Sequence, residues 1–149
     1  MKKSVVVDAI SYLLVLLFTY TGVTKLWDQH AFMVQLRQHP LLHDHVAYFV
    51  PTIPAIEVLI VFCLLIPRFR RKALVASAVL MGIFTIYVAY MVIRYPRVDL
   101  PCSCGGVMRL MSWPQHLVFN ACFTVMAIIA VVMDRSNRQE FTGSKIQMV

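Results

Sequence analysis

Residues 46–93 read VAYFVPTIPAIEVLIVFCLLI, PRFRRK and ALVASAVLMGIFTIYVAYMVI in succession, two long apolar runs separated by a link with four basic residues. As a helix, each run is long enough to cross a hydrocarbon core of ~30 Å, because a helix rises ~1.5 Å per residue. A link as short as 67–72 leaves two such helices antiparallel and adjacent. The stretch therefore predicts a helical hairpin embedded in a membrane.

Two further apolar runs, at residues 5–24 and 113–133, extend this hairpin. Asp8 and Glu57 are the only Asp, Glu, Lys or Arg residues in the four runs. Polarity does not alternate along the runs, as it would in the strands of a membrane barrel, so all four are expected to be helices. The predicted fold class is an all-α membrane protein, a four-transmembrane-helix antiparallel bundle.

The composition agrees with a membrane location. The chain has 149 residues, of which 60% are apolar and 14% charged, whereas a soluble domain is roughly 45–50% apolar and about 25% charged. A chain this short has too little interior to bury so much apolar surface, which excludes a soluble globular monomer. The net charge is +7, but the basic residues lie between apolar runs. They therefore indicate orientation in a bilayer, and no nucleic-acid partner is expected.

The distribution of Lys and Arg predicts the topology. Of these 14 residues, nine lie near the two termini or in the 67–72 link, and five lie in the 25–45 and 94–112 loops. The positive-inside rule then makes both termini cytoplasmic and places the two loops outside. Lys2 and Lys3 precede an apolar run, as in a signal peptide, but no small-x-small cleavage pattern follows. We expect the run to remain in the mature protein.

The chain is expected to form one membrane domain at residues 1–133, followed by a polar cytoplasmic tail at 134–149 that frays in water. The first outer loop mixes apolar and polar residues between Phe32 and Arg37. This mixture favours a short interfacial helix, ended by Pro40.

The strongest local signal for chemistry is PCSCGG at residues 101–106, in the second outer loop. Cys102 and Cys104 are one residue apart and could close a disulfide only in a small, strained ring, and strained disulfides exchange readily. The glycines would let an incoming thiol approach closely. A redox-active pair is favoured. A structural disulfide and a soft ligand pair for Cu(I) or Zn are the alternatives, although one CxC lacks the four ligands of a closed zinc site.

The remaining cysteines and the histidines of the first loop are weaker signals. Cys63 and Cys122 lie within apolar runs, where a lone cysteine usually behaves as a small hydrophobe. The sequence His43-Asp44-His45 is similar to a metal clamp, but the two histidines would share a face only in an extended strand. A solvated loop is favoured, and no metal site is predicted.

Two polar residues are expected to meet near the outer end of the bundle. Glu57 is the only carboxylate well inside a span, and intramembrane ionisable groups usually face the bundle interior with a partner. Lys25 closes the first span on the same side of the membrane, so the two could pair. Alternatively, Lys25 snorkels to the headgroups and Glu57 is protonated or hydrogen-bonded to a neighbouring hydroxyl.

His116 and Asn120 are four residues apart at the start of the last span, so they share one helical face. Trp113 and Pro114 form a natural beginning for this helix. A histidine beneath a dithiol could shuttle its proton or stabilise a thiolate. The alternative is an interfacial histidine that only forms hydrogen bonds.

Several short motifs together resemble the DoxX-like superfamily of four-helix membrane proteins, and most closely its MauE (methylamine utilisation protein) branch. They are Gly22-Val23-Thr24-Lys25-Leu26, Phe32, Pro40-Leu41, Pro54 with Glu57, Cys102-Ser103-Cys104-Gly105-Gly106, and Ser112-Trp113 with His116 and Asn120. The similarity covers roughly residues 4–133 and rests on the order of the motifs.

The resemblance implies a redox-associated protein of the bacterial inner membrane, with Cys102 and Cys104 as redox residues and Lys25, Glu57 and His116 as supporting groups. There is no CxxC and no fused thioredoxin-like domain, so a thiol partner would be a separate periplasmic chain. The interpretation is a thiol–disulfide oxidoreductase, or an accessory to one, with a membrane acceptor such as a quinone. The alternatives are a non-catalytic subunit or anchor of an envelope complex and a Cu(I)-handling protein.

Overall fold

The computed structural model describes residues 2–38, 42–94 and 112–146, and this part of the chain is helical, without strands. The elements are α1 (Lys2–Trp27), α2 (Gln29–Gln38), the short 3-10 helix η1 (His43–His45), α3 (Val46–Leu65), α4 (Arg70–Arg94) and α5 (Trp113–Ile146).

Four of the helices are long and apolar enough to cross a membrane. The spans are Ser4–Trp27, Val46–Leu65, Arg70–Arg94 and Trp113–Arg135. They coincide with the four runs of the sequence to within a few residues at each end. The predicted fold class is confirmed, and the chain is a multi-pass membrane protein.

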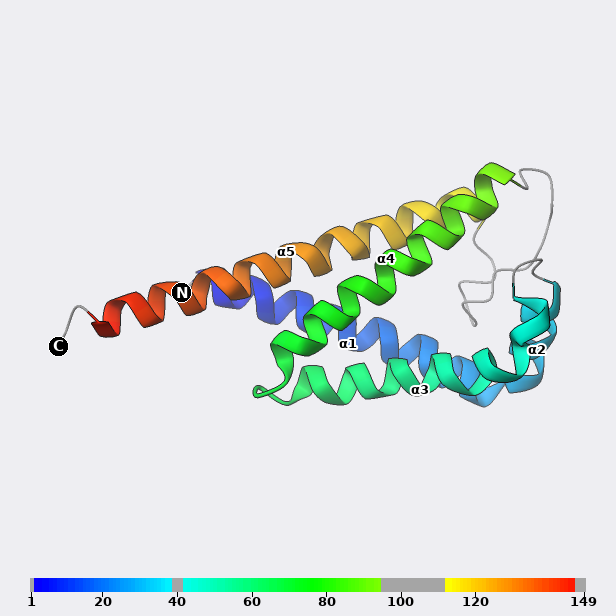
Figure 1. Cartoon of the computed structure of the whole chain (residues 1–149), viewed down its shortest axis with the longest axis horizontal. Helices are drawn as coiled ribbons and strands as arrows, with labels where there is room; N and C mark the ends of the chain where they lie inside the picture. Colours follow the sequence, from blue (N-terminus) through cyan, green and yellow to red (C-terminus); the bar gives the residue numbers. More distant parts are fainter. Residues whose placement is uncertain (1, 39–41, 95–111, 147–149) are drawn as a thin grey trace.

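The four long helices close a ring in which α1 packs on α3, α3 on α4, α4 on α5, and α5 on α1. Figure 1 shows the N-terminus and the α3–α4 connection at one end of the bundle, which we call the terminal end, and α2 at the opposite end. From the terminal end, α3 and α4 diverge toward α2 (Figure 1). The helix termini nearest α2 therefore surround the widest part of the bundle.

The interior is filled by apolar side chains from all four spans, and much of the outer surface is apolar as well. Leu14, Phe18 and Leu74 are at most 1% exposed, whereas Leu16, Leu59 and Ile83 are 60–69% exposed. In water such a surface would be unfavourable, but acyl chains solvate it. The fold thus has an internal core and a lipid-facing exterior.

The expected short helix in the first loop is present as α2, which packs mainly on α3. Phe32 and Leu36 lie one helical turn apart and are buried with Val46 and Val50 of α3 in a second apolar cluster. Packing against α3 places α2 over one end of the bundle.

A polar tail is expected from residue 134, and in the structure α5 continues through residues 134–146, ending at Ile146. The membrane span has already nucleated this helix, so each added residue costs little, and residues 134–146 contain no proline. Asp134 is also held by an ion pair with Arg70, Oδ1 to Nη2 at 3.6 Å.

Arg70 joins three helices at the terminal end. Besides Asp134 of α5, it contacts Asp8 of α1, with Nη1 donating to Oδ1 at 2.5 Å. Asp134 is 7% exposed, and its Oδ2 has no hydrogen-bond partner among the described residues. Because Arg70 begins α4, this charge cluster links the start of α4 to α5 and to α1.

Candidate functional site

A buried ion pair joins α1 to α3 near the α2 end of the bundle. Lys25 Nζ lies 2.5 Å from Glu57 Oε1, and both side chains are 3% exposed. The pairing considered from the sequence is therefore present, whereas snorkelling of Lys25 to the surface is not observed. The Nζ also lies 5.7 Å from the ring centre of Phe32 and 5.6 Å from that of Phe84, within the range of cation–π attraction.

The close approach of α1 to Glu57 depends on a glycine. A Cβ built on Gly22 would lie 3.5 Å from Glu57 Oε2 and 3.6 Å from both Glu57 Cβ and a methyl of Val58. Glycine therefore leaves just enough room for a methyl group between the helices. Any larger side chain at this position would push α1 away from the carboxylate.

His116 and Asn120 of α5 face the same region and are 1% and 5% exposed. They line a small space of about 20 Å³ together with Lys25 and Glu57. Thr21, Phe84 and other side chains complete its walls. The structure thus brings four of the six predicted site residues together from three helices.

The beginning of α5 sets the position of this histidine. The Ser112 amide donates to Gln115 Oε1 at 3.0 Å, and the His116 amide donates to the Ser112 carbonyl at 2.9 Å. The first contact is half of a capping box, which defines where a helix starts. Asn120 follows His116 by one turn on the same face, as the spacing predicted.

Glu57 Oε2 and Asn120 Nδ2 are buried polar atoms of this cluster for which the described residues supply no hydrogen-bond partner. The Thr21 hydroxyl lies nearby but contacts the Phe18 carbonyl at 3.5 Å. Buried polar atoms are nearly always satisfied by protein or by water. A space of about 20 Å³ exceeds the ~10–15 Å³ that one water needs. The site can therefore hold a water that bridges the carboxylate and the amide.

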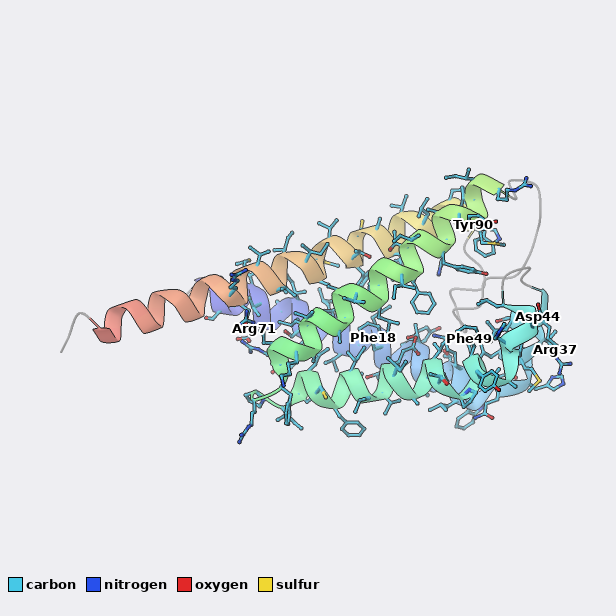
Figure 2. All side chains as sticks on the ribbon, in the orientation of Figure 1. Phe18, Arg37, Asp44, Phe49, Arg71 and Tyr90 are labelled. Atoms are coloured by element: carbon cyan, nitrogen blue, oxygen red, sulfur yellow. The ribbon has the colours of Figure 1, made fainter. Side chains whose placement is uncertain are left out.

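A larger cavity of about 320 Å³ adjoins the cluster where α3 and α4 diverge. Most of its walls are apolar side chains of α2, α3 and α4, and Lys25 and Trp113 contribute from α1 and α5. Lys25 and Phe84 line both spaces. Figure 2 labels Phe49, one of the lining residues, on α3. The polar cluster of Lys25, Glu57, His116 and Asn120 and the apolar cavity thus lie side by side.

Cys102 and Cys104 lie outside the described residues. The described residues nearest to them in the chain are Arg94, which ends α4, and Ser112, which precedes α5. Both flanking positions are at the α2 end, the same end as the polar cluster.

The other candidate residues are dispersed. Cys63 is half-buried against the main apolar core, and Cys122 is exposed on α5. Over the described ranges, no three His, Cys, Asp or Glu side chains gather into a metal site. Sequence reasoning noted Asp8 as a charge in a span but missed its contact with Arg70. The contact could have been predicted, because the positive-inside rule placed Asp8 and the basic 67–72 link on the same side of the membrane.

The fold and the site define a multi-pass membrane protein, a four-helix bundle with a buried polar cluster at one end. A family model described as methylamine utilisation protein MauE matches residues 3–133. The chain therefore belongs to the MauE family, which confirms that part of the resemblance. No curated protein and no solved structure matches the chain.

Proposed function

We propose that this protein carries out thiol–disulfide exchange through Cys102 and Cys104 at the periplasmic face of a bacterial inner membrane. The observation that carries the proposal is the buried cluster of Lys25, Glu57, His116 and Asn120 at the end of the bundle where α4 ends and α5 begins, the two helices that flank the cysteine segment in the chain. Seven residues lie between Arg94 and Cys102, and an extended chain spans ~3.3–3.6 Å per residue. That length is enough for the thiols to approach the cluster.

The proposed exchange has two steps. The Cys102 thiolate attacks one sulfur of a partner disulfide, which forms a mixed disulfide and releases the partner's other sulfur as a thiolate. The Cys104 thiolate then attacks Cys102, which frees the partner as a dithiol and leaves the pair as a disulfide. Two electrons and two protons pass from the pair to the partner, and the reverse reaction oxidises a partner dithiol by the same steps.

The buried cluster would handle the protons of this exchange. His116 is suited to accept a thiol proton, and Glu57, which lines the same small space, can exchange a proton with it through a water held there. The redox partner is a separate periplasmic thioredoxin-like or disulfide-containing protein. A membrane quinone or quinol exchanges two electrons and two protons with the pair to complete the cycle. Both termini are cytoplasmic in this proposal.

Trapping tests the exchange. In Cys104→Ser, a mixed disulfide with a partner should accumulate on Cys102 because the resolving thiol is gone. Cys122→Ser is the control, since Cys122 is exposed on α5 and has no role in the proposal. If neither Cys102→Ser nor Cys104→Ser traps a partner and the double variant functions normally, the exchange is refuted and a non-catalytic subunit is favoured. Copper that co-purifies with the wild type but not with the double variant would instead support Cu(I) handling.

The proposed topology has its own test. After mild reduction of intact spheroplasts, an impermeant maleimide should label Cys102 and Cys104, and labelling should disappear in the double Cys→Ser variant. Cys63, half-buried in the bundle, should remain unlabelled. Labelling of the pair only after the membrane is permeabilised would place the segment in the cytoplasm and remove the basis for a periplasmic exchange.

A further inference from the structure

The cavity of about 320 Å³ between α2, α3 and α4 has the size and lining of a ligand site. Protein pockets for small molecules typically measure ~300–1,000 Å³ and combine apolar walls with a few polar groups. Here the walls include the aromatic rings of Phe32, Phe49, Phe84, Tyr87 and Trp113. This lining favours an apolar body, and in particular a planar one.

Lys25 supplies a buried hydrogen-bond donor at the wall of this cavity. An ammonium group has three N–H donors, and Lys25 Nζ has a single hydrogen-bond acceptor among the described residues, Glu57 Oε1. The rings of Phe32 and Phe84 near Nζ attract the charge but accept no conventional hydrogen bond. A buried donor without an acceptor is unfavourable. An oxygen atom of a ligand in the cavity would satisfy it.

The charge of the ligand follows from the ion pair. Lys25 and Glu57 together are neutral, so an anionic ligand would compete with Glu57 and a cationic ligand would be repelled by Lys25. The other residues that line the cavity include no charged side chain that could compensate an anionic or a cationic ligand. Burying an unpaired charge in such surroundings is costly. The ligand is therefore uncharged.

We propose that this cavity binds an uncharged, membrane-soluble molecule with an apolar body and a carbonyl oxygen, which accepts a hydrogen bond from Lys25 Nζ. Ile56 and Ile83 line the cavity and are 39% and 60% exposed, so the site is accessible from the lipid side between α3 and α4. Two sources share this chemistry, a ring carbonyl compound such as a quinone and the ester end of an acyl lipid. The site stands independently of thiol exchange at Cys102 and Cys104.

The test uses the full chain in detergent, with Trp27→Phe as background, which leaves Trp113 of the cavity wall as the only tryptophan. The probe 1,4-naphthoquinone should quench Trp113 saturably. Val88→Phe, at a lining position 2% exposed, should weaken binding tenfold or more, whereas the matched Val79→Phe, at a position 56% exposed on the same helix, should not. Equal, non-saturating quenching in both variants would overturn the proposal.

A second variant tests the donor and covers the case in which Val88→Phe fails to fold. Lys25→Met combined with Glu57→Leu removes the donor without leaving an unpaired charge, and it should weaken probe binding by about tenfold or more. Unchanged affinity in that variant would contradict the role of Lys25.

Two further measurements distinguish a ring carbonyl compound from an acyl ester as the natural ligand. Competition by methyl decanoate at concentrations similar to those of the quinone would indicate an acyl ester, and its failure would indicate a ring carbonyl compound. Organic extraction of purified wild-type and Val88→Phe proteins should show one of these compounds depleted in the variant. Identical extracts from the two proteins would show that the cavity retains no such molecule.

Discussion

Lys25 Nζ and Glu57 Oε1 are 2.5 Å apart, although the two residues are 32 positions apart in the chain and lie on different helices. Neither charge reaches water or headgroups, since both side chains are 3% exposed. Each charge therefore depends on the other for its stabilisation. The pair joins α1 to α3, and its Lys25 lines both the small space of the polar cluster and the apolar cavity.

Removing one partner of this pair should be far more harmful than removing both. Lys25→Met or Glu57→Leu alone leaves an unpaired buried charge, which typically costs about 3–5 kcal/mol. The double variant replaces the pair by apolar groups of similar volume and should recover most of this loss. Thermal unfolding in detergent would measure the three variants, and a double variant no more stable than either single one would contradict the pairing.

Gly22 should tolerate one methyl group and no more. Gly22→Ala adds a Cβ at ordinary contact distance from Glu57 and Val58, and it should be neutral or stabilising by up to about 1 kcal/mol, since alanine favours helix. Gly22→Val should destabilise by about 1–3 kcal/mol through overpacking.

Gly82 provides the control for Gly22, because a Cβ there would meet nothing within 4 Å. Alanine and valine should both be accepted at Gly82 without the steric loss expected at Gly22. The four variants can be compared by thermal unfolding. Equal effects of valine at the two positions would show that α1 does not approach Glu57 as closely as described.

At the terminal end, Arg70 should matter more than Asp8. Asp8→Asn breaks a pair whose side chains are 45% and 31% exposed, and exposed pairs contribute about 0–1 kcal/mol. Arg70→Met also leaves Asp134, whose side chain is 10% exposed, without its partner, so we expect the larger loss of stability. Thermal unfolding at low and high salt would compare them, and equal losses would contradict a linking role for Arg70.

The polar cluster should contain one ordered water. A high-resolution experimental structure should show density within hydrogen-bond distance of Glu57 Oε2 and Asn120 Nδ2, since both atoms require a partner. Asn120→Leu should abolish this density and destabilise the protein. Thr85→Val, at the position after Phe84 but outside the cluster, is a control that removes a different, part-buried hydroxyl, whose contact with Thr124 is 2.8 Å. Persistence of the density in Asn120→Leu would contradict the proposed bridge.

The amino-acid sequence by itself determined the four spans and the short helix between the first two. Both follow from local properties, namely the length and apolar content of each run and the polarity of the links. Each run is stable in a bilayer as a helix nearly independently of the other runs. The sequence also indicated that Lys25 and Glu57 lie at a similar depth in the membrane, because the helix rise per residue gives the distance of each residue along the membrane normal.

Only the tertiary structure decided which helix faces meet. Hydropathy does not define how a span is rotated about its axis, since lipid and core side chains are equally apolar. The convergence of His116 and Asn120 on the ion pair, the contact of Arg70 with Asp134 and the cavity beside Phe84 all depend on the packing of several helices at once. The continuation of α5 to Ile146 likewise depends on a helix nucleated within the membrane span and on the Asp134 contact, which composition alone does not reveal.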